Sequence, residues 1–183
     1  MRNLVVISIS VIIAFIATSC GDKQLDSLYD GQEKKIQSLV TNLTRNNNDA
    51  TVESNNGSVR VTVVHGEGAP LSETGAVAFY YAGYYITGNS LSSSNMFATN
   101  NESFANSQRW STTDTTAFAI TTIKLGEDDI VEGLKNGLVG VKGGDECYVL
   151  FSGKRGFGKK KIANIPSNAA LAYRLWIKSV SND

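Results

Sequence analysis

Apolar and polar positions follow three different patterns along this chain. Residues 4–17 form a largely apolar run, and residues 32–43 carry apolar side chains at helical spacing. From residue 59 onward the two kinds of residue alternate over 59–64 and 171–178, and residues 76–85 form a tyrosine-rich apolar segment that is interpreted as a second strand. Alternation of this kind is typical of strands that bury one face. The pattern therefore predicts a leader segment, one helix and a sheet-based domain.

The last third of the chain predicts a further strand, a short helix and a buried strand. Residues 119–125 are expected to form a strand, and the acidic residues 127–129 are placed to begin a helix, because a helix N-terminus favours negative charge. A glycine turn at 143–144 leads into the apolar segment 147–151. Four residues of the expected helix share one face: Ile130, Val131, Leu134 and Leu138. The buried face of the last strand is expected to hold Leu171, Tyr173, Leu175 and Ile177.

Polar segments mark the expected loops. Residues 21–30 are predicted to be a loop, and the Asn- and Asp-rich residues 44–57 a hinge. The long polar stretch 89–116 is interpreted as an insertion, anchored by Phe104 and Trp110.

The last strand also points a tryptophan outward. Because Trp176 would be unfavourably exposed there, we expect the helix at 32–43 or the insertion to cover it. That helix is interpreted as a stalk holding the domain off a bilayer, with a dimerisation helix as the alternative.

The first twenty residues indicate export. The apolar run is shorter than the roughly 20 residues of a membrane span. It ends in Ala17-Thr18-Ser19-Cys20, small residues followed by a cysteine. This arrangement resembles the lipobox of bacterial lipoproteins and implies cleavage after residue 19 and lipidation of Cys20. The alternative is an ordinary secretory leader. Either reading takes the mature protein out of the cytoplasm. Lipidation places it in the bacterial cell envelope and favours the outer membrane, on its periplasmic or surface side.

Composition excludes several classes of function. The chain has 17 Lys and Arg against 17 Asp and Glu, so nucleic acid is not an expected partner. The run Lys159–Lys161 is interpreted as a solvated loop. His65 is the only histidine, and Cys147 lies in an apolar strand pattern as a core residue. Hydrolase triads and metal sites therefore lack the necessary residues, and neither a metal nor a cofactor is expected.

Short motifs in the domain occur in a characteristic order. They are Tyr81-Ala82-Gly83, Ile130-Val131-Glu132-Gly133-Leu134, Gly156-Phe157-Gly158 and Ile165-Pro166. Their order and spacing resemble the FKBP-type peptidyl-prolyl cis-trans isomerases. The resemblance implies an α+β fold in which an antiparallel half-barrel sheet wraps around one short helix. The expected parts are a signal peptide (1–19), an anchored stalk helix and linker (20–57) and an FKBP-like domain (58–183).

The resemblance also implies the catalytic residues. Tyr81 would offer a phenolic hydroxyl to the proline pocket, and the backbone N–H of Val131 would bind the substrate carbonyl. Phe157 stands where the family has a tyrosine, and Tyr173 takes the place of a pocket aromatic on the last strand. Phe97 is placed in the pocket wall in preference to a second register that uses residues 91–94.

Three further residues would bind substrate: Ile130, Leu134 and Ile165. Two departures from the family pattern concern activity. The family aspartate is missing from both registers, and Leu134 occupies a position where many members have tryptophan.

Two functions follow from the resemblance. The first is an isomerase that accelerates cis-trans isomerisation of X-Pro bonds in envelope proteins, within a dry aromatic pocket and without covalent chemistry. The second is a catalytically weak module that binds polypeptide as a chaperone. Both imply proline-containing, unfolded or extended polypeptides as partners, and the membrane through the lipid on Cys20.

Overall fold

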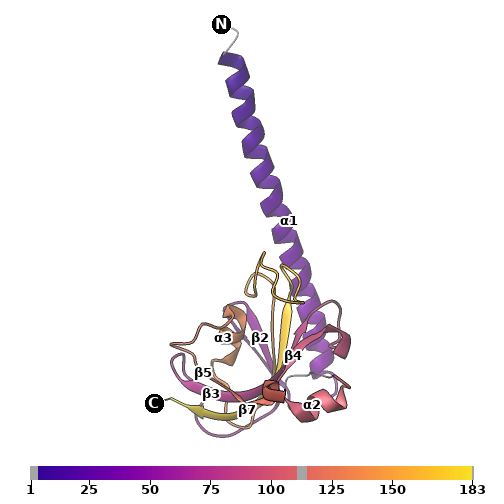
Figure 1. Ribbon diagram of the computed structural model, residues 1–183, viewed down its shortest axis with the longest axis vertical. Coiled ribbons are helices and arrows are strands. Elements are labelled where there is room, and N and C mark those ends of the chain that lie inside the picture. The colour runs from indigo at the N-terminus through magenta and orange to yellow at the C-terminus, as the bar shows by residue number, and fades with distance from the viewer. Residues whose placement is uncertain (1–3, 111–114, 183) are drawn as a thin grey trace.

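The computed structural model describes the backbone of residues 4–110 and 115–182, and the side chains of residues 23–110 and 117–182. Within these ranges one long helix precedes a sheet domain, and its N-terminal half projects away from the sheet (Figure 1). The helices are α1 (Leu4–Thr44), α2 (Glu102–Ser107) and α3 (Glu132–Leu138), with short 3-10 turns at Ser93–Asn95 and Thr115–Phe118. The strands are β1 (Thr51–Asn55), β2 (Ser58–Val64), β3 (Ala76–Tyr85), β4 (Met96–Thr99), β5 (Thr121–Lys124), β6 (Glu146–Phe151) and β7 (Leu171–Ser181).

The strands form one antiparallel sheet in the order β1-β2-β6-β7-β3-β4, and β5 also pairs with β3. The two longest strands, β3 and β7, lie side by side, with Tyr81 opposite Leu175 and Gly83 opposite Tyr173. Both strands were predicted, β7 from its alternation, and the buried positions of β7 follow that alternation. The α+β fold with an antiparallel sheet around one short helix is therefore confirmed.

Each face of the sheet has its own apolar core. On one face α3 packs against β6, and its Leu134 and Leu138 join a core that includes Phe151 and Leu175. On the other face α1 packs against β2 and β6 through the buried residues Ile36, Leu39 and Val40. The C-terminal half of α1 is thus part of the domain, not a free stalk.

Two predicted loops are wrong. Residues 21–30 are helical, because they continue α1 without a break despite their polar composition. The expected hinge at 44–57 contains β1, which pairs with β2 from Thr51↔Thr62 to Asn55↔Ser58. Strand β1 is mostly exposed, so no alternation marks it in the sequence. The acidic residues 127–129 also lie in a turn before α3 rather than in its first turn.

Trp176 is covered by the insertion, one of the two elements predicted to do so. The ring of Phe104 in α2 lies 5.1 Å from the ring of Trp176, and the Arg174 guanidinium lies over both rings. Trp110 packs on the same face. Four residues of the insertion, 111–114, fall outside the described part of the chain.

Among the described residues no helix is both long and apolar enough to cross a membrane. The side chain of Cys20 falls outside the described side chains, so lipidation of this residue stays a prediction.

Candidate active site

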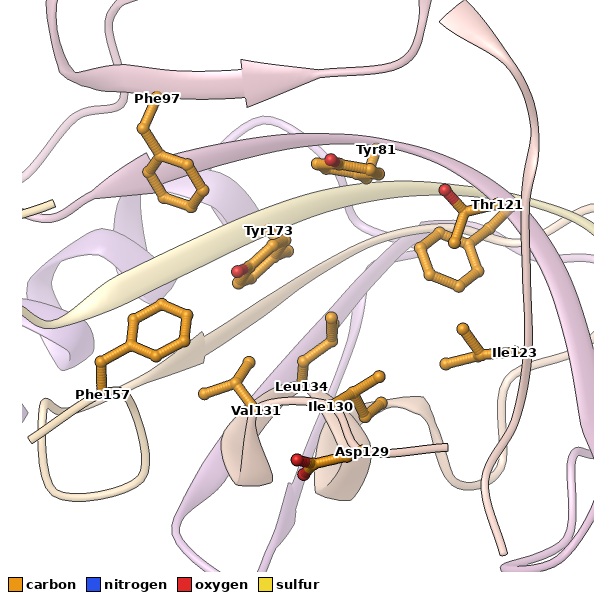
Figure 2. A pocket seen from close by; sticks show the side chains of 11 residues that line it. Tyr81, Phe97, Thr121, Ile123, Asp129, Ile130, Val131, Leu134, Phe157 and Tyr173 are labelled. Atoms are coloured by element: carbon orange, nitrogen blue, oxygen red, sulfur yellow. The ribbon is translucent and has the colours of Figure 1, made fainter. Parts of the chain in front are cut away.

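A cavity of about 340 Å³ opens between the sheet, α3 and the loop after β6. Figure 2 shows its side chains converging from β3, β4, β5, β7 and the start of α3. The lining residues are Phe79, Tyr81, Phe97, Thr121, Ile123, Asp129, Ile130, Val131, Leu134, Phe157 and Tyr173. Most are apolar or aromatic, and Asp129 is the one charged side chain among them. The cavity is therefore suited to an apolar ring with a small number of polar contacts.

Alternation along β3 and β7 builds the floor of the pocket. Phe79 and Tyr81 are two residues apart and share a face, and their ring centroids lie 6.3 Å apart. Tyr173 of β7 lies 6.1 Å from Tyr81 and 6.0 Å from Phe151 beneath it, nearly parallel to the latter ring. These contacts fix the rings as a rigid apolar surface.

Phe97 forms the wall above this floor, and Gly83 makes room for it. The Phe97 ring meets Tyr173 edge-on at 5.8 Å. A Cβ atom built on Gly83 would lie 2.5 Å from the Phe97 ring, closer than real side chains approach. The position two residues after Tyr81 therefore requires glycine for steric reasons, since any larger residue would displace Phe97.

The start of α3 supplies the opposite wall. Ile130, Val131 and Leu134 point into the cavity (Figure 2). Val131 is the N-cap of α3, and among the described residues its backbone N–H has no acceptor. Free N–H groups at a helix start are available to an incoming carbonyl oxygen.

The β1–β2 hairpin holds α3 in place by polar contacts. Ser58 Oγ donates to the carbonyl of Gly133 at 2.7 Å. The buried Arg60 donates from Nη1 to the carbonyls of Gly137 (3.0 Å) and Val139 (2.5 Å), and from Nη2 to Glu53 at 2.6 Å. A cation at a helix C-terminus also offsets the negative end of the helix dipole.

A second polar clamp fixes the backbone of Tyr81. The buried Asn100 accepts from the N–H of Tyr81 at 2.5 Å, while Thr99 Oγ1 donates to the Tyr81 carbonyl at 2.6 Å. Asn100 Nδ2 also donates to the carbonyl of Ala119 and to Thr121 Oγ1. One amide thus ties together β3 and the segment that begins β5.

Two phenols face the cavity. Tyr173 is only 7% exposed, yet within the described residues its hydroxyl has no hydrogen-bond partner. Figure 2 shows it at the centre of the pocket, on the side where Phe97 and Phe157 lie. Burial raises the pKa of Tyr173, and the neighbouring Tyr81 raises it further. Burial likewise raises the pKa of Tyr81. Both hydroxyls therefore stay protonated at neutral pH and can donate a hydrogen bond to a ligand.

The comparisons with known proteins agree with this geometry. The model of the FKBP-type peptidyl-prolyl cis-trans isomerase family matches residues 71–178, more than half of the chain. The chain belongs to this family. No curated protein matches the sequence.

Solved structures show the same fold at low sequence identity. The chain is similar to FkpA from Escherichia coli (15% identity, TM-score 0.55), over 99% of this chain and 74% of that one. It is also similar to the N-terminal domain of FKBP42 from Arabidopsis thaliana (15%, TM-score 0.54), over 73% and 94%. A peptidyl-prolyl cis-trans isomerase from Pseudomonas syringae gives 13% identity and a TM-score of 0.55, over 82% and 93%. Together with the family match, this fold identifies the chain as an FKBP-type peptidyl-prolyl isomerase.

Seven of the eight site residues carried over from the family resemblance line the pocket. They are Tyr81, Phe97, Ile130, Val131, Leu134, Phe157 and Tyr173. Ile165 does not line it: this residue is 5% exposed and lies in the core on the same face of the sheet. Position alone tests no chemistry, so the role of each residue stays a prediction.

Sequence reasoning missed four lining residues: Phe79, Thr121, Ile123 and Asp129. Three of them carried a signal. Phe79 lies two residues before Tyr81 on β3, and Thr121 and Ile123 are two residues apart on β5, so each pair shares a face. The clamp residues Asn100 and Arg60 gave no such signal, since polar residues are buried only where tertiary contacts provide partners.

Proposed function

We propose that this isomerase acts on proline-containing polypeptides in the bacterial cell envelope, held to a membrane by lipid on Cys20. The observation that carries the catalytic part is the apolar cavity, which is lined by Tyr81, Tyr173 and Val131. Among the described residues neither phenol has a hydrogen-bond partner, and the N–H of Val131 has no acceptor. The lipobox-like Cys20 supports the location.

The pocket needs no acid, base or nucleophile for this reaction. Rotation about an X-Pro bond is slow because amide resonance resists it, with a barrier of roughly 20 kcal/mol. A dry aromatic environment favours the twisted, less dipolar amide, and a fixed N–H can hold the carbonyl on one side of the bond. Lowering the barrier by about 4 kcal/mol accelerates the reaction roughly a thousandfold.

In this mechanism the proline ring packs against the floor of Tyr81, Tyr173 and Leu134. The N–H of Val131 binds a carbonyl of the substrate, and the Tyr173 hydroxyl donates to a second acceptor as the bond rotates. The rigid rings and the clamped backbone of Tyr81 keep these groups in place, so little reorganisation is required as the X-Pro bond rotates.

A second candidate function is a chaperone that keeps the fold for binding alone. Two observations favour it: the family aspartate is absent beside Phe97, where Ala98 stands, and Phe157 lacks the hydroxyl of the family tyrosine. Binding of extended chains requires only the apolar cavity, whereas rapid turnover requires the donors as well.

Proline-limited refolding of an unfolded client separates the two functions. The full protein, purified from membranes in detergent, is added to the refolding reaction as wild type, Tyr81→Ala or Tyr80→Ala. Tyr80 is the neighbour on the opposite face of β3 and serves as the matched control. If the protein is an isomerase, we expect wild type and Tyr80→Ala to accelerate refolding and Tyr81→Ala not to. Suppressed aggregation without acceleration would instead assign the protein to the chaperone class.

A further inference from the structure

The loop between β6 and β7, residues 152–170, carries a strong positive charge. This basic loop contains five Lys and Arg and no Asp or Glu. Its Arg155 pairs with Glu132. The four lysines, Lys154 and Lys159–Lys161, are exposed, and none pairs with a carboxylate in the described part of the chain. The loop therefore presents four unneutralised cations to its surroundings.

Helix α1 holds both ends of the basic loop. Gln32 donates to the carbonyl of Asn168 at 2.6 Å and accepts from the N–H of Gly153 at 2.8 Å. The Tyr29 hydroxyl donates to the Asn168 side chain at 3.1 Å. In Figure 1 the loop, coloured orange to yellow, rises beside α1 on the side from which the N-terminal half of α1 leaves the domain. The basic loop and the N-terminal half of the helix thus share one end of the molecule.

The distance from this loop to Cys20 is short. Tyr29 lies nine positions after Cys20 in the helix, which is about 14 Å along the axis at 1.5 Å per residue. Ile36 and Leu39 are buried against the sheet, so the domain does not hang on a free tether. Between residues 21 and 35 the helix carries three Lys and four Asp or Glu, so the positive charge at this end comes from the basic loop.

We propose that the basic loop docks on the anionic headgroups of the bilayer that holds Cys20. This inference rests on the lipid anchoring proposed above. Lysines close to an anionic surface are attracted to it, whereas the same charges far from it are screened by salt. The loop also exposes an apolar side chain, Ile162 (39%), directly after the three lysines, and such a residue fits the interface between headgroups and acyl chains.

Docking has a consequence for the active site. Phe157, one wall of the pocket, belongs to the basic loop. A docked loop would therefore fix the pocket at a set orientation next to the membrane, where chains emerging from it are the nearest substrates. A lipid anchor alone would leave that orientation free.

Lysine reactivity on vesicles tests the docking. The mature protein, which begins at Cys20, is inserted into preformed vesicles of phosphatidylcholine, with or without phosphatidylglycerol. A water-soluble acetylating reagent is applied, and each lysine is read by mass spectrometry. We expect Lys159–Lys161 to react about fivefold more slowly on the anionic vesicles and to recover in high salt. Lys178, near the far end of β7 from the basic loop, reports a surface that docking leaves unchanged.

A charge-matched pair of variants provides the second readout. The test variant replaces all three lysines of the run (Lys159→Gln, Lys160→Gln, Lys161→Gln). The control makes the same substitutions at Lys135, Lys142 and Lys178, and so has the same net charge. On anionic vesicles, backbone hydrogen exchange in the basic loop slows in wild type and control and stays fast in the test variant.

The outcomes separate the two proposals. The mass of the N-terminal peptide shows whether Cys20 is acylated, and an unmodified cysteine overturns both the anchor and the docking. Acylated protein with equal reactivity of Lys159–Lys161 on both vesicles overturns the docking alone. Protection seen on native envelope membranes but not on phosphatidylglycerol vesicles would assign the basic loop to an acidic macromolecule and overturn the lipid assignment.

Discussion

The phenol of Tyr173 is the most consequential single group in the pocket. It is almost fully buried, and in the described part of the chain it lacks a partner. Because this hydroxyl faces the cavity, it is available to donate a hydrogen bond to a ligand that enters. Phe157 supplies no hydroxyl at the rim, so Tyr173 and Tyr81 are the phenolic donors of this cavity.

Replacing Tyr173 by phenylalanine removes this donor and keeps the ring. We expect kcat/KM for a prolyl peptide to fall about tenfold, equivalent to about 1.4 kcal/mol, because one hydrogen bond to the turning amide is lost. Thermal stability should be unchanged or slightly higher. Tyr80→Phe removes a phenol from the other face of β3 and is expected to leave kcat/KM as it is. Equal activity of wild type and Tyr173→Phe would contradict the assigned role.

Gly83→Ala tests the packing of Phe97. The added Cβ would meet the Phe97 ring at 2.5 Å, so the ring must leave its position against Tyr173. We expect a loss of about 1–3 kcal/mol in the free energy of unfolding, as for overpacked cores, together with weaker peptide binding. Gly88→Ala, at a position with open space around it, is the matched control. An unshifted Phe97 ring signal in the NMR spectrum would contradict this account of the glycine.

At the scale of single residues, the sequence predicted the pocket residues that belong to the family motifs and few others. Tyr81, Val131 and Tyr173 reach the pocket because strand alternation and helix spacing orient them. Asn100 could not be predicted in this way, because its four hydrogen bonds depend on where β3 and β5 meet in space.

At the scale of elements, the hairpin of β1 and β2 determines where α3 lies. The helix approaches β6 so closely that a Cβ atom on Gly137 would lie 2.1 Å from Val149. Ser58 and Arg60 bind carbonyl groups at its start and end. The hairpin precedes the region matched by the family model, yet it positions the helix that lines the pocket.

Arg60→Met should therefore be strongly destabilising. The substitution leaves the carbonyls of Gly137 and Val139 without their donor, and we expect a loss of about 3 kcal/mol in the free energy of unfolding. Urea unfolding monitored by fluorescence measures it. Arg45→Met removes an exposed arginine and is expected to change stability by less than about 0.5 kcal/mol. A similar small effect in both variants would show that Arg60 does not hold α3.

Elements were predictable where the local sequence is rich in apolar residues. Strands β3 and β7 satisfy this condition, because both of their faces pack in an apolar core. Strand β1 is exposed on both faces, so its polar sequence predicts a hinge, and the polar residues 21–30 predict a loop. In both cases the neighbouring element, β2 or the rest of α1, fixes a structure that local pattern does not encode.

At the scale of the whole molecule, the buried Cys147 ties stability to pH. Burial raises the pKa of its thiol to about 12 in the folded state, whereas an unfolded thiol has a pKa of about 8.5. Below pH 8.5 both states keep the proton and stability is constant. Above it the unfolded state loses the proton first, which favours unfolding.

We therefore expect the free energy of unfolding to fall by about 2 kcal/mol between pH 8 and pH 10 through this group. Cys147→Ala lowers stability at pH 7, because it leaves a small cavity. Its free energy of unfolding should not show the fall between pH 8 and pH 10 that the thiol causes. Urea unfolding across the pH range measures both. Parallel stability curves for the two proteins would contradict the assignment to Cys147.

The most direct test of the account is exchange spectroscopy by NMR on a short Xaa-Pro peptide with a catalytic amount of the full-length protein. Exchange between cis and trans peaks, absent for the peptide alone on this timescale, reports catalysis without a coupled protease. We predict exchange peaks with wild type and Tyr80→Ala, and their loss with Tyr81→Ala. Peptide binding at the pocket without exchange peaks would contradict the claim that this cavity catalyses prolyl isomerisation.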